Sequence, residues 1–192
     1  MGVQSVEGVI QNSMAAEAAV AWYQSRLGFV CSASDVLTGP ELAQLFQWPE
    51  STRLQRWILR LGEETLQIWG WPAGTCAPYP DSWGGNDRWF QHICLVTDNL
   101  TAQVEAMASD RLEVISIAPQ TLPEWNPAAA GIQAFKFKDP DGHPLELLQF
   151  PAGKGDPRWH QAQVPSGQPK GMDHSAISIA NTEASLAFYR DV

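Results

Sequence analysis

Three absences narrow the class of this protein. No apolar run approaches the roughly 20 residues that a membrane-spanning helix needs, and residues 1–8 lack the basic and apolar regions of a secretory signal. Basic residues are few: the chain has 12 Lys and Arg but 21 Asp and Glu, which gives a formal net charge of −9. Such a chain repels a phosphate backbone, which disfavours nucleic acid as a partner. We therefore expect a cytoplasmic protein that binds neither a membrane nor nucleic acid.

Cysteine is also scarce. Cys31, Cys76 and Cys94 lie far apart in the sequence and form no CxxC pair. This distribution disfavours a disulfide framework or a zinc knuckle and is typical of buried thiols in a reducing compartment. Hydrophobic residues make up 44% of the chain, enough for a real core, so wholesale disorder is excluded.

Tryptophan, in contrast, is abundant. Nine tryptophans occur, several of them in the segments 77–90 and 122–131, which are rich in Pro and Gly. A loop tryptophan either caps the core or forms the wall of a pocket, where it offers a large apolar face and one N–H donor. We take as candidate substrate-pocket residues Trp69, Trp71, Trp83, Phe90, Trp125 and Phe150.

An internal repeat dominates the sequence. Residues 6–29, 90–109 and 172–192 each show a short alternating strand, a polar break and a helical pattern. The first and last copies share an aromatic-Tyr pair, Trp22-Tyr23 and Phe188-Tyr189. When the copies are aligned, equivalent strand positions are occupied by Gly8, His92 and His174.

The segments that follow the first two copies also match each other. Residues 53–74 align with residues 131–153, each as strand, turn and strand closed by Pro-Ala-Gly, which places Gln67 opposite Glu146. Further strands are expected at 30–38 and 112–120. The sequence therefore predicts an α+β fold of two βαβββ units, residues 3–74 and 88–153, within a domain of residues 1–153.

Glu146 is unusual because it lies in an otherwise apolar strand. Alternation places Glu146, Leu148 and Phe150 on one face of this strand and Leu145 and Leu147 on the other. Both faces are mostly apolar, so the strand should be covered on both sides. A carboxylate in such a setting needs a cation, a metal ion or several hydrogen-bond donors.

The repeated units, together with the motifs "HICLVTDN", "FYRDV" and "FKDPDGHPLELLQF", resemble the vicinal oxygen chelate superfamily. This superfamily includes glyoxalase I, extradiol dioxygenases and the bleomycin- and fosfomycin-resistance proteins. The resemblance implies that paired units form an open mixed β-barrel or cup with helices outside. It further implies a divalent metal at the base of the cup, which chelates two neighbouring oxygens of a small substrate.

The resemblance also assigns candidate ligands. His92 and Glu146 match metal-ligand positions, Gln67 stands where a carboxylate is usual, and Gly8 offers no ligand, while Glu7 beside it should face the other way. Imidazole and carboxylate suit Fe, Mn, Ni, Co or Zn. An extradiol dioxygenase needs two His and one carboxylate around iron, so Gly8 favours a lyase or isomerase instead, with Glu146 as a candidate catalytic base.

A metal-free alternative stays open. His92 and Glu146 would then form a charge-assisted hydrogen bond inside a cup that sequesters a planar or aromatic ligand. His143, in the turn after Gly142, is expected to face solvent, and His160 lies in a segment that looks like a linker, so neither matches a ligand position.

Residues 154–170 are rich in Pro, Gly and polar residues and are predicted to form a linker. A third unit starts after them, and we interpret residues 171–192 as the βα start of a truncated second domain. His174 would then be a ligand of a second barrel that this sequence does not include. The segment is expected to pack outside, to pair with another copy in a homodimer, or to be poorly ordered.

Overall fold

The computed structural model describes residues 8–72, 75, 77, 79–80, 82–161 and 164–191. Glu7, Cys76 and the end of the first Pro-Ala-Gly motif, residues 73–74, lie outside these residues. The strands are β1 (Gly8–Ser13), β2 (Val30–Leu37), β3 (Leu54–Leu61), β4 (Glu64–Gly70), β5 (Phe90–Val96), β6 (Gln120–Thr121), β7 (Gln133–Lys138), β8 (Pro144–Gln149) and β9 (Gly171–Ile177). The helices are α1 (Ala16–Leu27), α2 (Pro40–Phe46), α3 (Leu100–Met107) and α4 (Thr182–Asp191), with the short 3-10 turns η1 (Ala108–Asp110) and η2 (Pro157–His160). None of the helices described is long and apolar enough to cross a membrane.

The strands form two mixed sheets of related topology. One has the order β1-β4-β3-β2, and the other has the order β6-β7-β8-β5-β9. In both sheets the first strand of a unit pairs in parallel with the last strand, β1 with β4 and β5 with β8, and the remaining pairs are antiparallel. This shared order confirms the predicted α+β fold of two βαβββ units. The described strands do not close into a barrel.

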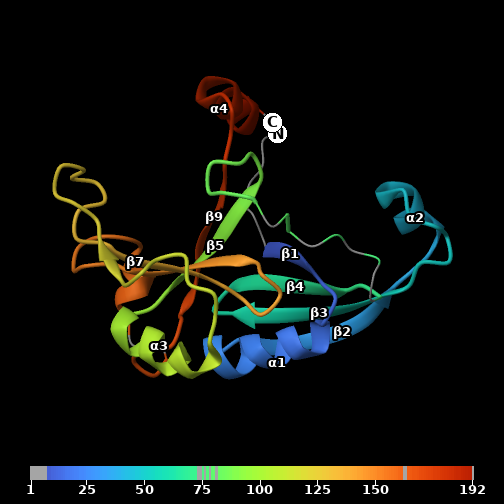
Figure 1. Ribbon diagram of the computed structural model, residues 1–192, viewed down its shortest axis with the longest axis horizontal. Coiled ribbons are helices and arrows are strands. Elements are labelled where there is room, and N and C mark those ends of the chain that lie inside the picture. The colour runs from blue at the N-terminus through green and yellow to red at the C-terminus, as the bar shows by residue number, and fades with distance from the viewer. Residues whose placement is uncertain are drawn as a thin grey trace.

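Helices α1 and α3 lie on the same side of the molecule, beneath the sheets in Figure 1. Alternate residues of the central strands point toward these helices and form one continuous core with them, which includes Leu66, Ile68, Ile93, Leu95, Leu145 and Leu147. The intervening residues, among them His92 and Glu146, therefore face the opposite side. This separation keeps the polar positions of the central strands out of the main core.

The predicted turn before β8 forms as expected. Asp139 Oδ1 accepts hydrogen bonds from the backbone N–H groups of Asp141 and His143, at 2.9 and 2.8 Å. Gly142 adopts a φ of 88°, a left-handed conformation that glycine takes without the Cβ clash of other residues. The turn thereby fixes the direction in which β8 and its Glu146 enter the sheet.

The strand expected at 112–120 is largely wrong. Only an isolated bridge between Val114 and Phe137 and the two-residue β6 are present. The backbone N–H groups of Ile115 and Ser116 both donate to the carbonyl of Lys136. Two residues of this segment therefore lie opposite one residue of β7, as in a β-bulge, and regular strand pairing is interrupted. Ile117 is 98% exposed, so the alternating apolar pattern here reflects no buried face.

The third repeat does not stand apart from the second unit. β9 pairs antiparallel with β5 and forms the edge of the second sheet, while α4 projects from the opposite side to α1 and α3 (Figure 1). The predicted linker contains η2, whose Trp159 is buried. Of the three placements expected for residues 171–192, packing against the preceding domain is therefore the one observed for β9.

Candidate metal centre

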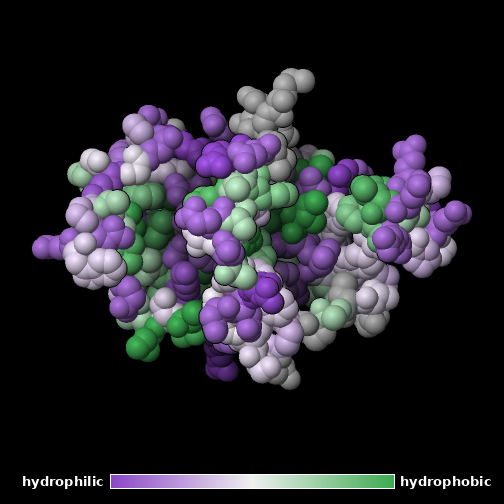
Figure 2. All heavy atoms as spheres, turned by 90° about the horizontal axis from the view of Figure 1, so that it is seen from above, coloured by the Kyte–Doolittle hydropathy of each residue, from purple (hydrophilic) through white to green (hydrophobic). Residues whose placement is uncertain are grey.

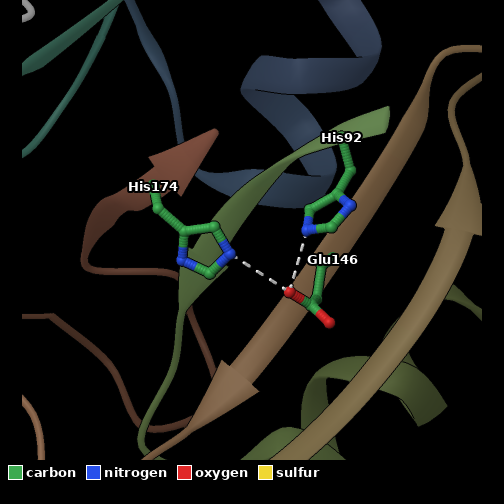
Figure 3. A group of neighbouring side chains, drawn as sticks. All are labelled: His92, Glu146 and His174. Carbon is green, nitrogen blue, oxygen red and sulfur yellow. Dashed lines mark ion pairs between the residues drawn. The ribbon is translucent and has the colours of Figure 1, made fainter. Parts of the chain in front are cut away.

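Three side chains from three adjacent strands converge on one point. His92 comes from β5, Glu146 from β8 and His174 from β9, and β5 lies between the other two strands. Cys94 is paired with both Glu146 and His174 across the sheet, and His92, two residues before Cys94, shares their face. Figure 3 shows both imidazoles turned toward the Glu146 carboxylate. Glu146 Oε2 lies 3.1 Å from His92 Nε2 and 3.5 Å from His174 Nε2.

These three side chains fit a metal ion. Each offers one ligand atom, and the three atoms lie within 4.8 Å of one another. His92 Nε2 is buried and, despite its short distance to Glu146, has no hydrogen bond of acceptable geometry in the part of the chain that the structure describes. A buried nitrogen that faces a carboxylate without a hydrogen bond is what a ligand atom looks like in the absence of its ion. Two His and one carboxylate are also a recurrent donor set for divalent transition metals.

Asp173 orients one of the ligands. Its Oδ2 lies 2.9 Å from Nδ1 of His174, on the far side of the ring from Glu146. A hydrogen bond at Nδ1 fixes the tautomer that leaves a lone pair on Nε2, the arrangement in which metal-bound imidazoles are usually held. His174 is therefore held by its neighbour in the sequence in an orientation that suits a candidate ligand.

The site holds a concentrated set of charges. Burial raises the pKa of Glu146, but its interactions with His174 and His92 and the charge of Lys136 outweigh burial and hold this pKa well below its usual range. The hydrogen bond to Asp173, followed by the interaction with Glu146, raises the pKa of His174 to about 9. Burial, followed by the charge of Glu146, raises the pKa of the Cys94 thiol far above its usual range, so Cys94 is a neutral neighbour and not a thiolate ligand.

The first unit clamps β9 in place. Glu64 Oε1 pairs with Arg158 Nη1 at 2.5 Å, and Glu64 Oε2 accepts a hydrogen bond from the backbone N–H of Met172 at 3.0 Å. Trp159 Nε1 donates to Asp173 Oδ1 at 3.1 Å, and the Arg158 guanidinium stacks 3.9 Å from the Trp159 ring. Residues of the predicted linker thus connect β4 to the strand that carries His174.

Gly8 leaves the first-strand position of the first unit without a side chain. A Cβ added to Gly8 would lie 2.2 Å from the carbonyl oxygen of Thr65, so β1 approaches β4 too closely for a side chain there. Gly8 and His174 both line a cavity of about 230 Å³. In this structure the strand that carries His174 pairs with β5, and the expectation that His174 belongs to a second barrel stays a prediction.

A protein-family model, described as the Glyoxalase/Bleomycin resistance protein/Dioxygenase superfamily, matches residues 9–147. The chain belongs to this superfamily. The match spans β1 through most of β8 and so includes His92 and Glu146, whereas His174 lies beyond it. No curated protein sequence matched the chain.

Solved structures of the superfamily share the fold at low sequence identity. A glyoxalase family protein from Bacillus cereus has a TM-score of 0.65 and 8% identity, over 78% of this chain and 95% of the other. A putative dioxygenase from Bacillus subtilis has a TM-score of 0.63 and 12% identity, over 100% of this chain and 55% of the other. A glyoxalase family protein from Enterococcus faecalis has a TM-score of 0.51 and 17% identity, over 76% and 98%. At these identities the likeness concerns the fold alone.

Gln67, the weaker ligand assigned by the superfamily pattern, stays a prediction. Its Oε1 accepts a hydrogen bond from Trp69 Nε1 at 3.1 Å. Gln67 shares its face of β4 with Trp69, while Leu66 and Ile68 on the other face enter the main core. To serve as a ligand, the Gln67 amide would have to exchange its bond to Trp69 for the ion.

The candidate aromatic residues do not form one pocket. Trp71 and Phe90 line a cavity of about 650 Å³, whereas Phe150 lines a different cavity of about 190 Å³. Trp69 is buried in a second, small core cluster beside Trp48, Trp83 packs against Tyr79 and Trp89, and Trp125 is 82% exposed. The role of these residues in binding a substrate stays a prediction.

The expectation that His143 faces solvent was wrong. Its side chain is only 13% exposed, and its Nδ1 lies 3.0 Å from Asp139 Oδ2. Burial lowers the pKa of His143, but the hydrogen bond to Asp139 and the charges of Asp139 and Asp141 outweigh burial and raise this pKa above its ordinary value. The turn folds the His143 side chain back against Asp139, the first residue of the turn. The residue types of the turn alone did not indicate this contact.

Proposed function

We propose that the protein binds a divalent metal ion through His92, Glu146 and His174 and acts on a small substrate that chelates the ion through two neighbouring oxygens. The observation that carries the proposal is the convergence of two imidazole nitrogens on one carboxylate oxygen, at 3.1 and 3.5 Å. Three protein ligands would leave positions free for a bidentate substrate. When bound, the metal would act as a Lewis acid on the substrate oxygens.

The protein's own residues would supply proton transfer and charge. Glu146, displaced from the metal, or a bound water is the candidate base. The depressed pKa of Glu146 keeps it ionised at neutral pH but makes it a weaker base than an ordinary carboxylate. Lys136 Nζ lies 3.6 Å from Glu146 Oε1 and offers a cation at the rim of the site, where its side chain is 40% exposed. An anionic substrate oxygen would therefore meet a positive charge on the solvent side.

His174 changes the expected reaction class. The sequence favours lyase or isomerase chemistry because Gly8 leaves the superfamily pattern one His short. With His174 included, the donor set is the two-His, one-carboxylate group of non-haem iron oxygenases. We therefore place ring-opening dioxygenation of a vicinal diol first and keep lyase or isomerase chemistry as the alternative within the same metal-dependent class.

A metal-free binding protein is the second candidate. The Glu146 carboxylate has His92, His174 and Lys136 within 3.6 Å, so protein groups alone can stabilise its charge. In that case the same cup would sequester a planar ligand without chemistry.

Metal analysis separates the two candidates. Protein purified without chelator is analysed by mass spectrometry for bound metals, together with His92→Ala, His174→Ala and the matched surface control His160→Ala. The proposal expects metal near one equivalent in the wild type and control, and its loss in both site variants. Equal metal content in all four proteins would reject the site.

The reaction class is tested next. Protein loaded with Fe(II) under nitrogen is given catechol, and oxygen uptake is followed on admission of air. Uptake that matches the catechol consumed, and its absence in His174→Ala, supports dioxygenation. Turnover of an oxygen-chelating substrate without oxygen uptake would point to a lyase or isomerase.

A homodimer through the outer edge of β9 also stays a prediction. Light scattering of the purified protein tests it.

A further inference from the structure

A second cavity lies apart from the metal cluster. It has a volume of about 650 Å³, and its walls come from β1, the segment after β4, the start of β5 and the turn between β7 and β8. None of the three cluster residues lines it among the residues described. Its aromatic walls are Trp71, Tyr79, Trp89 and Phe90. Figure 2, which views the molecule from the side of α4, shows hydrophobic groups within recesses of a largely hydrophilic surface.

The walls of this cavity carry polar atoms without partners. Five buried side-chain nitrogen or oxygen atoms lack a hydrogen bond in the described part of the chain, and three belong to wall residues: Gln11 Nε2, Trp89 Nε1 and Asp141 Oδ2. Buried polar groups without partners are destabilising, and native proteins usually satisfy them. Each of the three atoms exposes less than 1 Å², so it lies behind the cavity surface, and a ligand would pair with it once its side chain turns toward the cavity.

The orientation of the Gln11 amide decides what it offers. Tyr23 Oη lies 2.9 Å from both the Gln11 amide and Asp139 Oδ2. A hydroxyl has one proton, and the carboxylate of Asp139 can only accept, so Tyr23 donates to Asp139 and must accept from Gln11. The amide nitrogen of Gln11 therefore faces Tyr23, and its carbonyl oxygen is the group left for a ligand. Gln11 is 5% exposed, so this acceptor lies behind the cavity surface until the side chain turns toward a ligand.

The charge of the wall is negative. Asp139 is paired with His143, which also lines the cavity, at 3.0 Å. Lys138, next to Asp139 in the chain, pairs with Glu113 at 2.7 Å. Asp141 forms no ion pair among the described residues, although its charge contributes to the raised pKa of His143. The wall thus offers one uncompensated carboxylate and one amide carbonyl beside aromatic faces, and one indole N–H donor.

We propose that this cavity is a binding site for an arylalkylamine in its cationic ammonium form. The ammonium donates to Asp141 Oδ2 and to the Gln11 carbonyl, and the ring packs between Trp71, Trp89 and Phe90. Aromatic faces attract a cation directly, and the net charge of −9 raises its local concentration. An oxygen on the far end of the ligand accepts from Trp89 Nε1.

Tyramine is the probe that carries all three features. Binding to the full-length protein is measured by calorimetry in excess EDTA, so the result is independent of whether the metal site exists. We expect saturable binding of tyramine and much weaker binding of 4-ethylphenol, which lacks the amine, and of 3-(4-hydroxyphenyl)propionate, which is an anion. Equal binding of the three compounds, or no binding of tyramine at millimolar concentration, would overturn the proposal.

Two variants locate the site. Asp141→Asn should weaken tyramine binding by about tenfold to a hundredfold, as expected for loss of a hydrogen bond to a charged group. Asp191→Asn, on an exposed surface of α4, is the matched control and should change nothing. Trp89→Phe keeps an aromatic wall but removes the N–H donor, so it should weaken tyramine and leave phenethylamine, which has no oxygen, unchanged. If Asp141→Asn binds tyramine as tightly as the wild type, or if Trp89→Phe weakens both ligands equally, the assigned contacts are wrong.

Discussion

Asp173 and His174 are neighbours in sequence that act as one unit, because Asp173 Oδ2 lies 2.9 Å from the His174 Nδ1 that faces away from Glu146. The carboxylate thereby directs the other ring nitrogen toward the cluster. Adjacent strand residues normally point to opposite faces. Here the edge position of β9 and a register irregularity beside Cys94 allow the two side chains to meet.

The first prediction concerns this pair. Asp173→Asn should lower metal affinity by about tenfold to a hundredfold, because an amide orients and polarises the imidazole less than a carboxylate does. Competition against a chromophoric chelator measures the change. Asp191→Asn serves as the control, and an unaltered affinity in Asp173→Asn would show that the pair has no part in metal binding.

The second prediction concerns pH. In the metal-free protein the hydrogen bond to Asp173 and the interaction with Glu146 raise the pKa of His174 to about 9. A metal binds only the neutral imidazole, so below this pKa one proton must leave for each ion bound. Apparent metal affinity should therefore rise by about tenfold per pH unit between pH 7 and 8 and level off above pH 9. The same titration in His174→Ala should lose this dependence, whereas a wild-type affinity that is flat over this range would contradict the assignment.

The third prediction concerns the clamp on β9. Glu64→Gln removes the charge that pairs with Arg158 and weakens the bond to the backbone of Met172, so β9 should be held less firmly. We expect faster hydrogen exchange of β9 amides and lower metal affinity. Glu63→Gln is a close control, since Glu63 is 90% exposed and lies 3.8 Å from the same guanidinium. Equal effects of the two substitutions would mean that overall charge, and not the clamp, is responsible.

The fourth prediction concerns stability. Tyr23 is fully buried and its hydroxyl joins Gln11 of β1 to Asp139 of the β7–β8 turn. Tyr23→Phe leaves both partners short of a hydrogen bond and should lower the free energy of unfolding by about 1 to 3 kcal/mol. Urea denaturation measures this loss. Tyr189→Phe, at an exposed position of α4, should fall within about 0.5 kcal/mol of the wild type, and similar losses in both variants would contradict the role of the buried hydroxyl.

The sequence was sufficient for the fold and for two of the three converging side chains. Strand alternation placed each of His92 and Glu146 on a defined face of its own strand, and the resemblance to the superfamily implied that the two side chains converge. The repeat made His174 equivalent to His92 and assigned it to a second barrel. Its position beside His92 in this structure depends on the antiparallel pairing of β9 with β5, a long-range contact that periodicity does not encode.

Two other differences have local causes. The apolar alternation of residues 112–120 suggested a strand, but two N–H groups share the Lys136 carbonyl and break the ladder. His143 looked like an exposed turn residue, yet Asp139 draws it inward through its side chain and its backbone N–H. In both cases specific hydrogen bonds determine the local structure, and the pattern of residue types alone does not predict them.

The most direct test of the central claim is an anomalous-scattering map from crystals of the protein loaded with Fe(II) or Co(II). We predict a single strong peak within ligand distance of His92 Nε2, a Glu146 carboxylate oxygen and His174 Nε2. A metal-loaded crystal with no peak between these three side chains, or with a peak that His174 does not reach, would contradict the account.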